Sequence, residues 1–124
     1  MDKPVIAGKI NQRVIDLTGV TVPADTPIFV GETNIAHMKD EHPEHYALYG
    51  DKLGDIISSP DYIAKHPKKD SIEYIKVFND PVTDEHVLVA VRASKSGVYY
   101  ARSLFVMSED KKRKYRQKGA FKNY

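Results

Sequence analysis

Three runs in the second half of the chain alternate apolar and polar side chains with the period of two that a half-buried strand requires. The runs are residues 72–79, 87–93 and 98–107. Asn79-Asp80-Pro81 and Ser94-Lys95-Ser96-Gly97, which are typical turn residues, separate them. The pattern therefore predicts two consecutive hairpins and an antiparallel meander.

The first half has a different pattern, typical of helices. Thr33 or Asn34 can cap a helix that continues through Lys39. Pro43 ends that helix and suits the first turn of a second one, which we expect to reach about Ser58. The apolar side chains that this second helix would bury are Tyr46, Leu48 or Tyr49, Leu53, Ile56 and Ile57. Gly50 and Gly54 weaken it.

The order of the elements predicts an α+β fold, with N-terminal helices packed on the antiparallel meander. The length of 124 residues fits one domain. Within residues 1–124 we expect an N-terminal arm or short strands at 1–27, a core at 28–107 and a basic segment at 108–124. A turn is expected up to Pro67, and a basic C-terminal helix is expected to start at Ser108.

Charge is divided between the two halves. Residues 1–62 hold 5 Lys and Arg against 10 Asp and Glu, whereas residues 63–124 hold 14 against 7. The densest basic stretch, at 111–118, contains Lys111, Lys112, Arg113, Lys114 and Arg116. Such a surface attracts polyanions, although a solvated basic helix would look the same.

Composition excludes several classes of protein. The chain has no cysteine, which removes disulfides and thiolate metal sites and favours a reducing compartment. No apolar run is long enough to span a membrane, and no long apolar stretch follows Met1 as in a signal peptide. We therefore expect a cytoplasmic protein without a membrane partner.

Three of the five histidines fall within nine residues, at His37, His42 and His45. Imidazole titrates near neutral pH, so His37 or His42 can act as general acid or base. His37 is the better choice, because apolar neighbours in a capped helix can hold its ring. A metal site formed with Glu41 is a second interpretation, but the spacing is not that of two histidines on one helical face. A solvated, charge-rich helix end is the third.

The strands carry a second set of polar side chains. If Val87, Val89 and Val91 face the core, Arg92 points to the opposite face. Lys76, Tyr100 and Arg102 sit on faces that could join it. Arginine matches phosphate with two parallel hydrogen bonds, and tyrosine can stack on a base. Ordinary cross-strand pairs on a solvated face are the alternative.

The alternation along residues 98–107 also predicts which side chains of the third strand share a face. It places Tyr100, Arg102 and Leu104 on one face and Ser103 on the other. Arg102 and Ser103 can therefore enter one pocket only if the strand is bulged.

The stretch from Asn34 to Pro43 resembles the helix motif of phage-associated nucleases of the barnase–EndoU–colicin–RelE superfamily. The histidines of a His-x(4)-His-Pro pattern match His37 and His42, and a Pro-Asp-x-Ile segment matches residues 60–63. The resemblance covers roughly residues 28–107. The basic segment that follows has no counterpart in the motif.

This resemblance implies a ribonuclease that needs no metal or other cofactor. In such enzymes the ribose 2′-hydroxyl attacks the adjacent phosphate and leaves a 2′,3′-cyclic phosphate. The residues expected in catalysis are His37, His42, Arg92, Tyr100 and Arg102. Those expected to bind RNA are Lys76, Lys111, Lys112, Arg113, Lys114 and Arg116.

Other classes of function remain open. A toxin or effector of a phage or other mobile element is the first interpretation, and it implies an acidic antitoxin or immunity protein as partner. Such a protein would act in the cytoplasm of a bacterial host or target cell, or be delivered by a phage or secretion system. A non-catalytic nucleic-acid-binding module would use the same basic half. A protein-interaction domain of a mobile element would use the acidic half.

Overall fold

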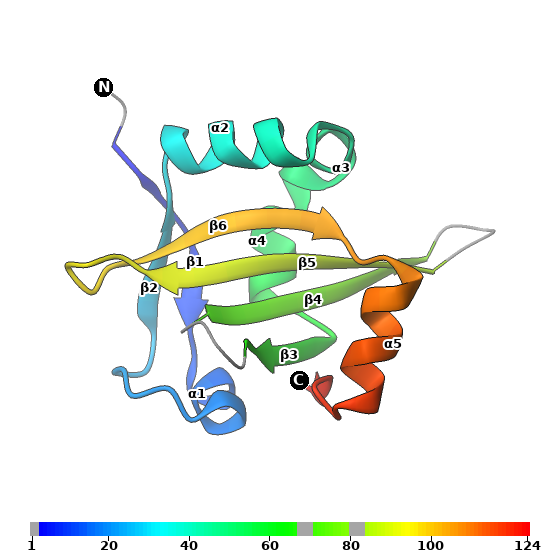
Figure 1. Cartoon of the computed structure of the whole chain (residues 1–124). Helices are drawn as coiled ribbons and strands as arrows, with labels where there is room; N and C mark the ends of the chain where they lie inside the picture. Colours follow the sequence, from blue (N-terminus) through cyan, green and yellow to red (C-terminus); the bar gives the residue numbers. More distant parts are fainter. Residues whose placement is uncertain (1–2, 67–70, 80–83) are drawn as a thin grey trace.

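One mixed sheet organises the computed structural model, which describes residues 3–66, 71–79 and 84–124 (Figure 1). The strand order in this part of the chain is β1-β2-β6-β5-β4-β3-β7. The strands are β1 (Val5–Ile10), β2 (Thr26–Val30), β3 (Tyr62–Lys65), β4 (Ser71–Asn79), β5 (Asp84–Ala93), β6 (Tyr99–Val106) and β7 (Lys122–Asn123). The helices are α1 (Gln12–Thr18), α2 (Glu32–Glu41), α3 (Pro43–Tyr49), α4 (Leu53–Ser58) and α5 (Glu109–Gln117). The fold is α+β, as predicted.

The predicted meander is confirmed. Strands β4, β5 and β6 pair antiparallel, and Val87, Val89 and Val91 are fully buried. The backbone N–H of Gly97 donates to the carbonyl of Ser94 in the predicted second turn. The first predicted turn, at 79–81, continues beyond the described residues.

Both flanks of the meander differ from the prediction. Strand β2 pairs parallel with β6, so the sheet is not wholly antiparallel. The segment 1–27 contains helix α1 between two strands, because Asn11 caps that helix by accepting from the N–H of Val14. The segment from Tyr62, expected as a turn, forms β3 and pairs with β4 and with the short C-terminal β7. Pairing across distant parts of the chain leaves no local signal.

The second predicted helix is broken. Helix α3 ends at Tyr49, a 3₁₀ turn follows over Gly50–Lys52, and α4 continues in a new direction. The ring of Tyr46 lies against Gly50, where a Cβ would be only 2.7 Å from it. Leu53, Ile56 and Ile57 are buried as predicted, whereas Leu48 is exposed and Tyr49 takes the inward position.

Helices cover the two faces of the sheet differently (Figure 1). Helix α4 packs behind the sheet on the face that carries Val87, Val89 and Val91, which forms the larger core. Helix α5 begins at a Ser108 cap and packs through Tyr115 on the opposite face, against Leu88 of β5. We call this opposite side the outer face. The part of the outer face toward β6 forms a groove.

A bulge in β6 sets which residues share the outer face. Ala90 pairs with Ser103 and Val91 pairs with Ala101, so Arg102 is the extra residue. The alternation changes phase there, because Leu104 turns to the core with Ala101. The faces predicted for Leu104 and Ser103 are therefore wrong, whereas Arg102 shares a hollow with Tyr100 as predicted. The condition for Arg102 and Ser103 to share a pocket is met.

Strand β1 passes close to α4 at Gly8. A Cβ on Gly8 would lie 2.4 Å from Cγ2 of Ile57, which is buried in the core. We expect Gly8→Ala to lower the free energy of unfolding by about 1–3 kcal/mol, because the packed helix must move. Urea unfolding measures this change. Gly54→Ala in α4, where the nearest atom is 3.8 Å away, should cause no loss, and equal losses in both variants would refute the packing argument.

His86 lies on β5 beneath α5. Its ring stacks on Tyr62 at 6.0 Å and lies 5.8 Å from Phe121. Burial lowers the pKa of His86 from its ordinary 6.5, and the charges of Lys112 and Arg116 lower it further against Asp84 and Glu109. The folded state therefore takes up this proton less readily than the unfolded state.

Stability is expected to fall as the pH drops below about 6.5, because the unfolded chain protonates His86 first. The loss should grow until the pH reaches the lowered pKa of the folded state. Urea unfolding between about pH 7.5 and pH 5 measures it. His86→Phe keeps an aromatic ring and should flatten this pH dependence. An unchanged slope in the variant would assign the effect to other groups.

Candidate functional site

Three adjoining hollows meet at Arg102. The sheet groove, of about 190 Å³, lies on the outer face and is lined by His66, Ser71, Glu73, Ala90, Arg92, Arg102, Ser103, Phe105 and Lys111. The helix hollow, also about 190 Å³, is lined by Thr33, Asn34, His37 and Arg102. The N-terminal hollow, of about 410 Å³, is lined by Pro4, Gly31, Glu32, Thr33, Asn34, Tyr100 and Arg102. One arginine side chain thus forms a wall of all three.

Arg102 owes this position to the bulge, which releases it from the regular alternation of β6. Its Nε atom is buried and has no hydrogen-bond partner among the described residues. A buried guanidinium donor without a partner is costly, and an anion supplies the partner that it lacks. The geometry is that of an anion-binding arginine.

Arg92 lines the sheet groove from β5. It pairs across the strands with Ser71 on one side and with Tyr100 on the other. Lys111, from the first turn of α5, enters the same groove with its Nζ 4.7 Å from the ring centre of Phe105. Cations from β5, β6 and α5 therefore converge on one small volume, which favours a phosphate ligand.

His37 lies on α2 and lines the helix hollow beside Arg102. Its Nε2 is 2.7 Å from Oε1 of Glu41, one helical turn on, and the two side chains are 54% and 44% exposed. In the neutral ring this contact places the proton on Nε2, so Nδ1 is left as the acceptor. His37 thus has the orientation and access of an acid–base group next to a cation.

His42 occupies a different place. It joins α2 to α3, and its ring stacks on His45 at 5.3 Å and tilts against Phe105, also at 5.3 Å. His45 is tied to the sheet, because its Nδ1 accepts from the backbone N–H of Val106. The three hollows around Arg102 do not include His42. Phe105, in the wall of the sheet groove, connects it to them.

The basic residues predicted to bind RNA are not one surface. Lys76 pairs with Val87 in the register, so it lies on the opposite face from Arg92, and its Nζ donates to the carbonyl of Ser59 at 2.7 Å. Its predicted place beside Arg92 is wrong. Lys112 is buried and forms an ion pair with Glu109 at 2.6 Å, which leaves it no access to a polyanion.

The remaining basic residues of α5 are more accessible. Arg113 and Lys114 form exposed ion pairs with Asp110, and Arg116 is exposed near His86. Of the residues predicted to bind RNA, only Lys111 lines the sheet groove.

Glu73 was missed by the sequence reasoning. It is buried in the sheet groove, and its Oε1 accepts from the hydroxyl of Tyr115 at 2.7 Å. Burial, followed by the bond to Glu73, raises the pKa of Tyr115 well above its usual value. The alternation along β4 could have identified it. Glu73 alternates with the buried Ile72 and Tyr74, and it therefore lies on the same face of the sheet as Arg92.

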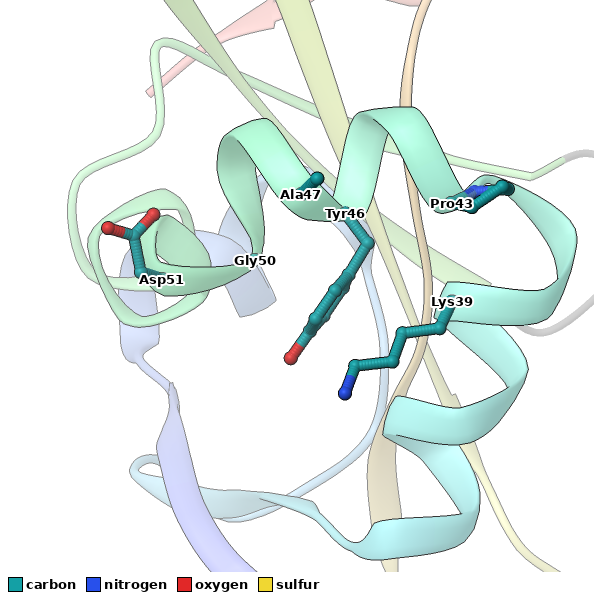
Figure 2. A pocket seen from close by; sticks show the side chains of 6 residues that line it. All are labelled: Lys39, Pro43, Tyr46, Ala47, Gly50 and Asp51. Atoms are coloured by element: carbon teal, nitrogen blue, oxygen red, sulfur yellow. The ribbon is translucent and has the colours of Figure 1, made fainter.

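A larger hollow lies elsewhere. It measures about 620 Å³ and lies between α2 and α3, lined by Lys39, Pro43, Tyr46, Ala47, Gly50 and Asp51 (Figure 2). Its walls are mostly apolar, and the Nζ of Lys39 lies 5.5 Å from the ring centre of Tyr46. Neither a histidine nor an arginine lines it, so it is the weaker candidate for chemistry on a phosphate.

Within the described residues no three His, Asp or Glu side chains come close enough to hold a metal ion. The metal site considered from the sequence would bring the histidines and Glu41 around one ion. In the structure His37 contacts Glu41, whereas His42 stacks on His45. Among the same residues, no helix is long and apolar enough to cross a membrane.

Comparison with known proteins gives one match. The family model described as phage-Barnase-EndoU-ColicinE5/D-RelE like nuclease3 covers residues 5–114. The matched segment contains α2 and the strands β4–β6, and it ends within α5 just after Lys111. No curated protein and no solved structure matches the chain significantly.

Proposed function

The chain belongs to the phage-Barnase-EndoU-ColicinE5/D-RelE like nuclease family, and we propose that it is an endoribonuclease that works without a metal ion. The ribose 2′-hydroxyl attacks the adjacent phosphate and yields a 2′,3′-cyclic phosphate and a free 5′-hydroxyl. The protein supplies a base, an acid and positive charge for the phosphate oxygens.

The observation that carries this proposal is the shared wall at Arg102. The side chain of Arg102 lines both the helix hollow, together with His37, and the sheet groove, together with Arg92. A phosphate bound by Arg102 has an imidazole on one side and a second guanidinium on the other. Such an arrangement positions a proton-transfer group and stabilises developing negative charge at one phosphorus.

Two groups can exchange the protons. His37 presents Nδ1 when Glu41 holds the proton at Nε2. Glu73 is the second group, and the hydroxyl of Tyr115 fixes one of its oxygens. We place these two on opposite sides of the bound phosphate, as an in-line displacement requires. The order of base and acid is left to experiment.

The experiment uses two oligonucleotides in excess EDTA. One contains a single ribonucleotide in a DNA strand, and the other is the same strand without that 2′-hydroxyl. The proposal expects cleavage of the first alone, with a cyclic phosphate at the new 3′ end. Cleavage of both strands would refute the 2′-hydroxyl mechanism, and loss of all cleavage in EDTA would show that a metal is needed. Salt-dependent binding without cleavage would favour a non-catalytic module.

A further inference from the structure

The N-terminal hollow has no role in moving protons, although it opens beside Arg102. At about 410 Å³ it has more than twice the volume of the helix hollow. That volume lies within the range of roughly 300–1,000 Å³ of small-molecule sites. Its walls come from three distant segments: Pro4 just before β1, the first turn of α2, and Tyr100 of β6.

Tyr100 gives this hollow a flat aromatic wall. The residue is half-buried, and its ring lies 6.3 Å from that of Phe29 at a tilt of 48°. It is therefore supported on β2 rather than free in solvent. Nucleobases of any type stack on such supported rings.

Asn34 supplies a polar edge to the same hollow. Its Oδ1 accepts from the backbone N–H of Gly31 at 2.9 Å, and this bond fixes the orientation of the amide. The Nδ2 end is then a donor in a wall that also contains Thr33 and Arg102. A planar ligand on Tyr100 thus has hydrogen-bond donors at its rim.

The N-terminal hollow adjoins the proposed phosphate site. Thr33, Asn34 and Arg102 line both the N-terminal hollow and the helix hollow of His37. A nucleotide whose phosphate is held by Arg102 extends its sugar and base into the neighbouring space. In a duplex that base would be stacked and paired, so it could not reach the ring of Tyr100.

From these contacts we propose that the N-terminal hollow binds the nucleobase next to the phosphate held by Arg102, and that the substrate is RNA with an unpaired base at that position. Tyr100 stacks on the base, and Asn34 hydrogen-bonds to its edge. The inference rests on the proposed ribonuclease function for the identity of the phosphate.

The test is a binding measurement that needs no cleavage. The probe is a dinucleoside monophosphate with 2′-fluoro riboses, which has one phosphate and no attacking hydroxyl. Two further probes lack the base on the 5′ or on the 3′ side. Titrations followed by NMR give each dissociation constant for the wild type and for Tyr100→Ala.

For the wild type, loss of one of the two bases should weaken binding about fivefold or more. For Tyr100→Ala, loss of the same base should have less than a twofold effect, because the stacking partner is already gone. Equal weakening in both proteins, or none in the wild type, would overturn the inference. Neither result depends on cleavage, so the ribonuclease proposal fails or stands separately.

Asn34→Asp is the second variant. It keeps the acceptor that caps α2 and replaces the Nδ2 donor by an oxygen. Comparison of the four bases at the identified position should show a changed order of affinity in this variant. An unchanged order would remove Asn34 from base recognition. Thermal unfolding checks that both variants remain folded.

Discussion

Arg102→Ala is expected to lower ribonuclease activity by about 10²–10³-fold, the usual loss when one preorganised donor to a developing negative charge is removed. The reason is its position in the wall of all three hollows. Its Nε atom has no hydrogen-bond partner in the part of the chain that the structure describes, so this donor is not used by the protein's own packing there. The loss is measured as kcat/KM on a substrate with a single ribonucleotide.

Two comparisons make the Arg102 result specific. Arg102→Lys retains a charge but not the planar fork, so it should recover only part of the activity. Arg113→Ala removes an exposed cation that pairs with Asp110 on α5, and it should leave kcat/KM within about twofold. If Arg113→Ala costs as much as Arg102→Ala, general charge rather than the groove explains RNA cleavage.

His37→Ala is expected to reduce kcat by about 10²–10⁴-fold with little change in KM, because general acid–base catalysis acts on the transition state. The helix should be unaffected, since the side chain is 54% exposed and its ion pair with Glu41 is solvated. Single-turnover cleavage, with circular dichroism as the check on folding, measures the effect.

The controls for His37 come from the same helix. Glu41→Gln keeps an acceptor for the ring but removes its negative charge, so it should cause a smaller loss and alter the pH profile of kcat. Lys39→Ala changes a residue that instead lines the hollow between α2 and α3 (Figure 2), and should leave kcat unchanged. Equal kcat values for the wild type and His37→Ala would remove His37 from the mechanism.

The sequence pattern predicted those structural features that are determined by residues close together in the chain. The alternation along β4 and β5 identified the buried valines and the outward direction of Arg92. Pro43 marked the boundary between α2 and α3. In each case the side chains that decide the outcome are only a few positions apart, so periodicity contains the information.

Features that depend on distant residues could not be predicted in this way. The parallel pairing of β2 with β6 joins segments about seventy residues apart. The bulge at Arg102 arises from the pairing of β6 with β5, and it reverses the faces that simple alternation assigns. The same limit explains Lys112, whose charge indicated exposure although its side chain is buried and pairs with Glu109.

The candidate site shows both situations. His37, Arg92 and Arg102 were selected from residue type and spacing, and they line adjoining hollows. His42 was selected by the same motif, but its ring is stacked between His45 and Phe105. Glu73 was overlooked because a single carboxylate in a strand has no motif, and only the fold places it beside Arg92.

The central claim is that His37 of α2 and Arg102 of β6 act on the same phosphate. A double-mutant cycle tests it most directly, with kcat/KM measured in EDTA for the wild type, His37→Ala, Arg102→Ala and the double variant. The account predicts that the double variant loses far less than the product of the two single losses, as expected for residues that act as a unit. Losses that multiply to within about twofold, or a single variant with full activity, would contradict it.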